Sequence, residues 1–192
     1  MDVGCGEGRF CRILRDLGIR TTGIDPTRAL LDRARTLDPT GDYRLETAEE
    51  MAVPAGGVDL VVAYLSLIDI PDINRAIPRM AAALRPGGTL LIANLTSFNT
   101  AGPIDGWAPD GKGGEHFPID HYMEERADAV GWRGIRILNW HRPLSRYMSL
   151  LLDQGLILRH FAEPVPHVGP PEKMERYRRM PFFLIMEWQK PG

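Results

Sequence analysis

The sequence predicts an α/β fold in three layers, with a doubly wound, mostly parallel sheet between two layers of helices. Two observations support this prediction. Strand-like apolar segments alternate with amphipathic helix-like segments from residue 1 to about residue 95. Two of the strand-like segments, 58–65 and 89–95, are almost continuously apolar, as expected for strands that are buried on both faces of a sheet.

The expected elements follow one another in a regular order. In the segment 8–18, apolar residues recur at helical spacing and Gly18 follows them, which is typical of a helix that ends in a glycine. Pro78 lies inside another helical segment, where we expect a kink or a late helix start. The expected strands are 1–3, 19–25, 42–46, 58–65 and 89–95, and the expected helices between them are 8–18, 26–37 and 74–85.

The alternation stops at Ser97. Residues 97–143 are rich in Gly, Pro, His and Trp and show no strong period. Regular structure is expected again after them, as helices at 145–155 and near 172–180 and strands at 156–163 and 181–189. We therefore expect one domain over residues 1–192, with an insertion at about 97–143 that forms the substrate side of the site.

The composition argues against several classes of partner. The chain has 23 basic and 25 acidic residues and a formal net charge of -2, whereas nucleic-acid-binding domains are usually basic. No apolar run reaches the length of a membrane span, and no signal peptide opens the chain, so we expect a cytoplasmic protein without a membrane partner. Cys5 and Cys11 do not have the spacing of a metal site, so no metal is expected.

Three glycines, Gly4, Gly6 and Gly8, follow the first strand-like residues, and Asp25 closes the next one, 17 residues after Gly8. At such a strand–loop–helix junction, backbone N–H groups and the helix dipole favour a nucleotide or an anion. An acidic residue at the end of the second strand can accept hydrogen bonds from both hydroxyls of a ribose. The pattern therefore predicts a nucleotide-type site.

Two large enzyme classes use this arrangement. Dinucleotide-dependent dehydrogenases have the motif G-x-G-x-x-G, whose third glycine allows a helix to pack closely beside a pyrophosphate. Here Arg9 takes the place of that third glycine, and Glu7 would put a carboxylate near the pyrophosphate. Both residues weaken the dinucleotide interpretation, which remains an alternative in the form of an NAD-dependent oxidoreductase.

The sequence resembles the class I S-adenosylmethionine-dependent methyltransferases, in particular the bacterial members that act on small molecules. The stretch "DVGCGEG" is similar to the glycine motif of that family, "GID" to its ribose-binding strand end, and "ALRPGGTLLIANL" to its late helix, double-glycine turn and fifth strand. This resemblance implies a Rossmann-like fold whose last strand, at 181–189, is antiparallel. It also implies S-adenosyl-L-methionine as the cofactor.

The resemblance also assigns site residues. The glycine loop would pack against the methionine part of the cofactor, Asp25 would hold the ribose, and Thr47 and Ala48 would meet the adenine. The family often has an Asp-Ala pair at the adenine, so Glu46 and Glu49 are candidates to supply the missing carboxylate. The cofactor-binding residues that we expect are Asp2, Gly4, Cys5, Gly6, Asp25, Pro26, Thr47, Ala48, Tyr64 and Leu65.

The implied reaction is methyl transfer to a small-molecule acceptor, by in-line displacement at the sulfonium methyl. A hydroxyl or protonated amine acceptor would need a general base. The candidates are His141, Asp69 and His116; the segment that begins "HRPLSRYMSLLLDQG" resembles one in bacterial small-molecule members, which favours His141 and Arg142. The alternative from another class is a protein that binds S-adenosylmethionine without turnover. We expect a monomer or a homodimer.

The start of the chain carries one more expectation. The resemblance implies a helix and a longer first strand before the glycine loop, whereas here three residues precede Gly4. We expect that Met1 is an internal or misassigned start, or that the gene is truncated. The alternative is that a partner subunit or the insertion covers the gap.

Overall fold

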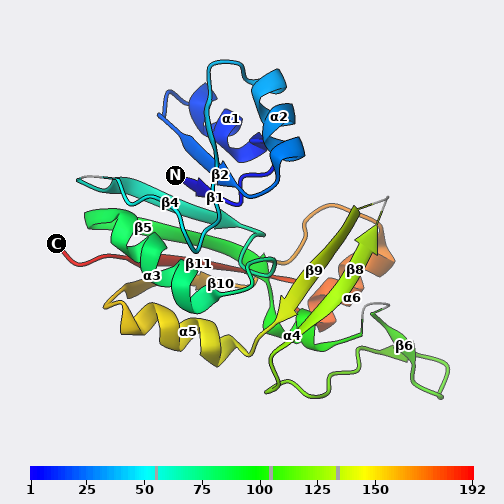
Figure 1. Cartoon of the computed structure of the whole chain (residues 1–192). Helices are drawn as coiled ribbons and strands as arrows, with labels where there is room; N and C mark the ends of the chain where they lie inside the picture. The colour runs from blue at the N-terminus through cyan, green and yellow to red at the C-terminus, as the bar shows by residue number, and fades with distance from the viewer. Residues whose placement is uncertain (55, 104–105, 133–134) are drawn as a thin grey trace.

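The computed structural model describes residues 1–54, 56–103, 106–132 and 135–192, and its centre is one seven-stranded sheet (Figure 1). The strand order is β10-β11-β5-β4-β1-β2-β3. Strands β1 to β5 run parallel to one another, whereas β11 runs antiparallel to both β5 and β10, which confirms the expected sheet and its antiparallel last strand. The bounds are β1 (Asp2–Val3), β2 (Thr22–Asp25), β3 (Asp42–Leu45), β4 (Val58–Tyr64), β5 (Leu84–Leu95), β10 (Ile157–Ala162) and β11 (Phe183–Gln189).

Helices flank the sheet, and their buried side chains form two hydrophobic clusters with it. Helices α1 (Arg9–Asp16) and α2 (Arg28–Leu37) pack near β3 around a small cluster that contains Cys11 and Leu31. Helices α3 (Ile73–Ala83) and α5 (Leu144–Asp153) contribute to the larger cluster, together with β4, β5 and β11. Within the described residues, no helix is both long and apolar enough to cross a membrane.

The segment around Pro78 differs from the expectation. Helix α3 begins at Ile73, before the proline, because the side chain of Asp72 accepts hydrogen bonds from two backbone N–H groups of its first turn. The helix ends at Ala83, and Leu84 is already extended and belongs to β5. The residue before a proline disfavours the helical conformation, so Pro86 helps to end the helix earlier than the expected residue 85.

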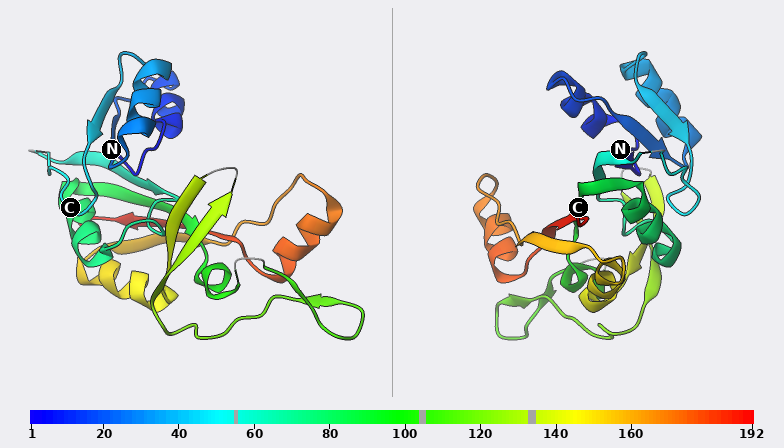
Figure 2. Two further views of the ribbon diagram at one scale, coloured as in Figure 1. Left: turned by 45° about the vertical axis from the view of Figure 1, so that its right-hand side comes forward. Right: turned by 90° about the vertical axis from the view of Figure 1, so that its left-hand side faces the viewer.

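The insertion has more regular structure than its sequence suggested. It holds α4 (Ser97–Ala101), the short strands β6 (Ala108–Pro109) and β7 (Glu115–His116), and the hairpin of β8 (Arg126–Trp132) and β9 (Ile135–His141). Residues 104–105 and 133–134 of the insertion lie outside the described part. Figure 2 shows the hairpin standing beside the carboxyl ends of β4 and β5. Helix α6 (Pro171–Arg179) lies between β10 and β11 in the sequence.

Candidate functional site

The glycine loop between β1 and α1 is tightly packed at one glycine and open at another. Gly4 has a φ of +76°, and a Cβ added to it would lie 2.4 Å from the Cβ of Ser66, so no larger residue fits there. Gly6 has a φ of +54°, and the space where its Cβ would stand is open. A ligand can therefore reach the backbone of the loop at Gly6.

Asp25 ties this loop to the end of β2. It is 6% exposed; its Oδ2 accepts a hydrogen bond from the Gly6 N–H at 2.9 Å and its Oδ1 from the Thr27 N–H at 2.8 Å. An ionised carboxylate has about four acceptor positions, so about two remain after these bonds. Asp25 can thus hold the loop and still accept hydrogen bonds from a bound ligand.

Two cavities meet at Gly4. The Asp25 cavity, about 700 Å³, extends from Gly4 past the ends of β2 and β3 to the hairpin strand β9. The Asp2 cavity, about 430 Å³, lies on the other side of Gly4, between the glycine loop, α1 and the end of β4. Each of the ten expected cofactor-binding residues lines one of the two cavities. Gly4, Asp25, Pro26, Thr47, Ala48 and Leu65 line the Asp25 cavity, and Asp2, Gly4, Cys5, Gly6 and Tyr64 line the Asp2 cavity.

Three buried polar atoms on the cavity walls have no hydrogen-bond partner among the described residues. They are Thr47 Oγ1 and Trp140 Nε1 in the Asp25 cavity and Asp2 Oδ1 in the Asp2 cavity. Buried polar groups are nearly always paired, so such atoms indicate a missing ligand or water. Hydroxyl, indole N–H and carboxylate suit a ligand with an amine and a heteroaromatic ring, as the cofactor implied by the sequence has.

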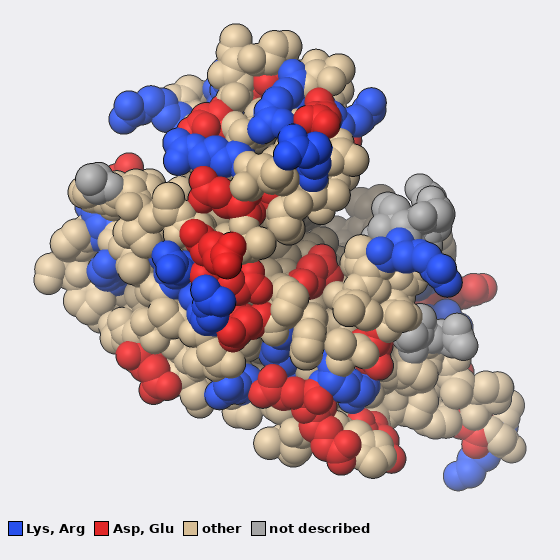
Figure 3. All heavy atoms as spheres, viewed as in Figure 1, with Lys and Arg blue, Asp and Glu red and all other residues tan. Residues whose placement is uncertain are grey.

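The charge of the Asp25 cavity favours a cation. Its lining includes six acidic residues and one basic residue, Arg75, and acidic side chains gather on this face below α2 (Figure 3). A cleft lined by one sign of charge attracts ligands of the opposite sign, so this cavity favours a sulfonium and disfavours a pyrophosphate. The acidic residues are Asp25, Glu46, Glu49, Glu50, Asp69 and Asp72.

Two carboxyl groups at the cavities have unusual pKa values. Burial raises the pKa of Asp2, which is 3% exposed, to about 6. Burial also raises the pKa of Asp69 to about 6, although the Asn139 side chain donates a hydrogen bond to Asp69 Oδ1 at 2.6 Å and favours its charged form. Perturbed carboxyl groups that face a cavity are typical of functional sites.

The end of β4 has a strained backbone beside the cavities. Leu65 has a φ of +55°, in the left-handed region that non-glycine residues rarely adopt, and its N–H donates to the Ala93 carbonyl at 2.7 Å. Such strain costs on the order of 1–3 kcal/mol and is found mostly at functional sites. The preceding residue, Tyr64, is 49% exposed and stacks on Phe10.

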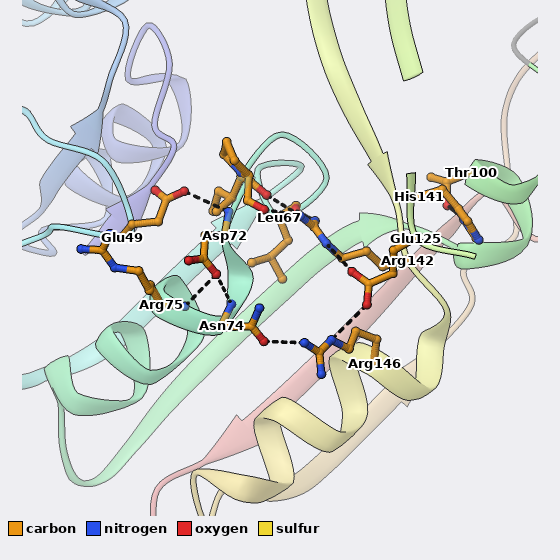
Figure 4. A network of polar contacts seen from close by, with 12 residues as sticks. Glu49, Leu67, Asp72, Asn74, Arg75, Thr100, Glu125, His141, Arg142 and Arg146 are labelled. Carbon is orange, nitrogen blue, oxygen red and sulfur yellow. Dashed lines mark hydrogen bonds and ion pairs between the residues drawn. The ribbon is translucent and has the colours of Figure 1, made fainter. Parts of the chain in front are cut away.

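His141 lies away from these cavities. It is 1% exposed; its Nε2–H donates to the Tyr122 carbonyl at 2.8 Å, and its Nδ1 is 2.8 Å from the Thr100 hydroxyl. Figure 4 shows it turned toward Thr100 on α4. It lines a third space, the His141 cavity of about 600 Å³, which is formed with α4, α6 and the hairpin. Both ring nitrogens are engaged within the fold, which is the geometry of a structural histidine.

The other two base candidates are also separated. His116 is exposed on β7 and lines none of the three cavities, whereas Asp69 lines the Asp25 cavity together with the expected cofactor residues. The structure therefore brings only Asp69, of the three, to the cofactor residues. Sequence reasoning missed Asn139 and Ser66, since the hairpin and the close packing at Gly4 had no evident signal in the sequence.

Ligands of open α/β sheets bind beyond the carboxyl ends of the strands, where both the Asp2 cavity and the Asp25 cavity lie. Both cavities therefore lie where open α/β folds bind nucleotides. A family model described as a methyltransferase domain matches residues 1–92. The crystal structure of an S-adenosylmethionine-dependent methyltransferase from Mesorhizobium loti is similar, with a TM-score of 0.86 and 26% identity over 98% of this chain and 89% of that one.

Curated relatives agree with this result. A ubiquinone biosynthesis O-methyltransferase of Methylobacterium sp. (strain 4-46) is 32% identical in an alignment 172 positions long that covers 81% of this chain and 68% of the relative. Other curated relatives are matched over less than half of their length. The share is 39% for the ubiquinone biosynthesis O-methyltransferase of Bradyrhizobium sp. (strain ORS 278), at 33% identity over 50% of this chain, and 42% for the malonyl-[acyl-carrier protein] O-methyltransferase of Serratia marcescens, at 30% identity over 56% of this chain. The chain belongs to the S-adenosylmethionine-dependent methyltransferase family, whose cofactor is S-adenosyl-L-methionine.

Proposed function

We propose that this protein transfers a methyl group from S-adenosylmethionine to a small-molecule acceptor. One observation carries the proposal: Gly4 of the glycine loop and Asp25 line a cavity whose charged residues are six acidic side chains and one basic side chain. When bound, the cofactor supplies a methyl group that its sulfonium activates for transfer. The names of the curated O-methyltransferases support an oxygen acceptor.

The residues of the cavities divide the work of binding. The free acceptor positions of Asp25 suit the ribose hydroxyls, and the buried Thr47 hydroxyl suits a polar edge of the adenine. The ionised form of Asp2 suits the amine of the methionine part, because its Oδ1 is buried without a partner in the described structure. Together these contacts fix the direction of the cofactor across Gly4.

We propose Asp69 as the general base for the acceptor. Its Oδ1 is held by Asn139, while no hydrogen bond of the described residues engages its Oδ2. A carboxyl group with a pKa near 6 is ionised at neutral pH and is still basic enough to accept a proton. Leu138 and Trp140 of β9 form the wall of the same cavity, where they can orient an acceptor and exclude water.

The test measures the release of S-adenosylhomocysteine from the purified protein with a panel of phenols, carboxylic acids and amines. The wild type is expected to turn over with at least one acceptor, and Asp69→Asn is expected to lower kcat by roughly 10²–10⁴-fold. Asp59→Asn is the control, because Asp59 is an exposed carboxylate at the opposite end of β4 that pairs with Arg85. An Asp69→Asn variant with wild-type kcat would show that Asp69 is not the base.

The same assay, together with calorimetry with NAD, separates the other candidates. A protein that binds without turnover releases no product with any acceptor, and an NAD-dependent oxidoreductase binds NAD in calorimetry. The acidic cavity opposes NAD, because a pyrophosphate would have to lie beside several carboxylates. A cytoplasmic location is part of this proposal and is supported by the two buried free cysteines, which are common in reducing compartments.

A further inference from the structure

Arg142 directly follows β9 and reaches into the loop that connects β4 to α3. Its guanidinium donates to the Leu67 carbonyl at 3.2 Å and to the Ile70 and Pro71 carbonyls at 2.8 Å each. The side chain is 1% exposed. Figure 4 shows it directed between Leu67 and Glu125. Buried carbonyl groups need donors, and the five N–H groups of one arginine satisfy three of them at once.

The loop that Arg142 holds, residues 65–72, forms part of the Asp25 cavity. It contributes Leu65, Ser66, Asp69, Ile70, Pro71 and Asp72 to the lining. A second residue of the same region, Trp140, donates its backbone N–H to the Ile68 carbonyl at 2.6 Å and lies 4.8 Å below the Arg142 guanidinium. Trp140 and Arg142, at the end of the hairpin, thus donate hydrogen bonds to four carbonyl groups of the loop. These carbonyls belong to Leu67, Ile68, Ile70 and Pro71.

The charge of Arg142 connects this loop to the insertion. Arg142 Nε lies 3.6 Å from a carboxylate oxygen of Glu125, which is in the insertion just before β8. Glu125 also lies 3.1 Å from Arg146 Nε on α5, and Arg146 donates to the Asn74 side chain on α3 at 2.6 Å. A buried cation is costly unless it is paired and hydrogen-bonded, and Arg142 is both, so its contacts favour one geometry of the loop.

We propose that Arg142 is a positioning residue for methyl transfer: it holds the 65–72 loop, and through it Asp69, against the cofactor. The proposal rests on the function proposed above. Asn139 holds the Asp69 carboxylate directly and Arg142 holds the backbone on both sides of it, so β9 and its end fix the base from two directions. Because Arg142 pairs with Glu125, the insertion also contributes to holding the 65–72 loop.

The decisive test is Arg142→Lys, with Arg146→Lys as the matched control, since Arg146 pairs with Glu125 and contacts no carbonyl of the loop. A lysine has one nitrogen and cannot reach three carbonyls on both sides of Asp69. Arg142→Lys is expected to bind S-adenosylhomocysteine about tenfold more weakly in calorimetry, equal to ~1.4 kcal/mol. Arg146→Lys is expected to stay within about twofold of the wild type, a margin that this conversion puts near ~0.4 kcal/mol.

The pH profile gives a second readout. A loosened loop exposes Asp69 to water, so the acid limb of the kcat/KM profile is expected to move to lower pH in Arg142→Lys only. A lower melting temperature with unchanged affinity and an unchanged acid limb would reduce Arg142 to a structural residue and overturn the proposal.

A milder variant covers the case in which Arg142→Lys does not fold. Glu125→Gln removes a half-exposed partner and is expected to weaken S-adenosylhomocysteine binding about threefold, in line with a partly exposed ion pair. Unchanged affinity in this variant counts against the proposal. If the wild type transfers no methyl group to any acceptor, only the proposed function fails. The affinity measurements need no turnover, so they still decide whether Arg142 positions the loop.

Discussion

Asp25→Asn tests the cofactor site most directly. The two oxygens of Asp25 accept hydrogen bonds from the N–H groups of Gly6 and Thr27, and the residue is 6% exposed. An asparagine keeps one carbonyl oxygen and turns an NH₂ group toward the other backbone donor. One N–H therefore loses its acceptor, and the glycine loop and the start of α2 are no longer tied to the same side chain.

The magnitude follows from the type of bond. A hydrogen bond to a charged group contributes ~1.5–3 kcal/mol. The loop must be ordered for the cofactor to bind, so the loss is expected in the affinity. Because each ~1.4 kcal/mol is tenfold, S-adenosylhomocysteine should bind roughly 10- to 150-fold more weakly to Asp25→Asn.

Calorimetry with S-adenosylhomocysteine measures this change without turnover, and a thermal melt of the same samples shows whether the fold is intact. Asp32→Asn is the matched control, because Asp32 is an exposed carboxylate on α2 that pairs with Arg35 and lines none of the three cavities. An affinity of Asp25→Asn within twofold of the wild type would refute the inference that Asp25 orders the glycine loop for the cofactor.

Two further predictions concern pH. Burial raises the pKa of Asp2 to about 6, so its carboxyl group is mostly protonated below that pH and S-adenosylmethionine binding should weaken as pH falls through 6. Calorimetry at pH 5 and pH 7.5 measures this change in affinity. The change should be smaller in Asp2→Asn and should be retained in Asp69→Asn. Burial lowers the pKa of His141 below its ordinary value, so its contribution to stability is present above the unfolded pKa and is lost as pH falls below about 6.5. His141→Phe should lower the free energy of unfolding by about 2 kcal/mol at pH 7.5, because two hydrogen bonds are lost, and should make the stability less sensitive to acid. Turnover per folded molecule should stay unchanged. A selective loss of kcat would instead show that His141 acts as a base.

The meeting of the expected cofactor residues at two cavities was predictable because its signals are local. A glycine with a left-handed backbone, an acidic residue at a strand end and the alternation of strand and helix all lie within short stretches of sequence. In a parallel sheet whose strands are connected by helices, the carboxyl ends of all strands lie at the same edge. Residues that follow these strand ends, such as Gly4, Asp25 and Thr47, are therefore expected to lie close together. Each expected cofactor residue therefore lies at a cavity.

The packing of the hairpin against the 65–72 loop was not predictable because it depends on contacts between distant residues. Asn139 bonds Asp69 across 70 positions, and Arg142 bonds Leu67 across 75. The hairpin that carries Asn139 pairs with itself and not with the main sheet, so it needs no continuous apolar run and left no clear period in the sequence. The sequence showed which residue types the hairpin contains, but not where the hairpin lies in the fold.

The distance of His141 from the expected cofactor residues has a physical cause of the same kind. Successive side chains of a strand point to opposite sides, so β9 is a wall between two cavities. Ile137, Leu138 and Trp140 line the Asp25 cavity, whereas Asn139 and His141 line the His141 cavity; the Asn139 amide also donates to Asp69, which lines the Asp25 cavity. A shift of the β9 register by one residue would bring His141 to the cofactor side and turn Trp140 away from it. The contacts of Trp140 with Ile68 and of Arg142 with Leu67 oppose that shift, so the same bonds that hold the 65–72 loop also decide which residue of β9 faces the acceptor.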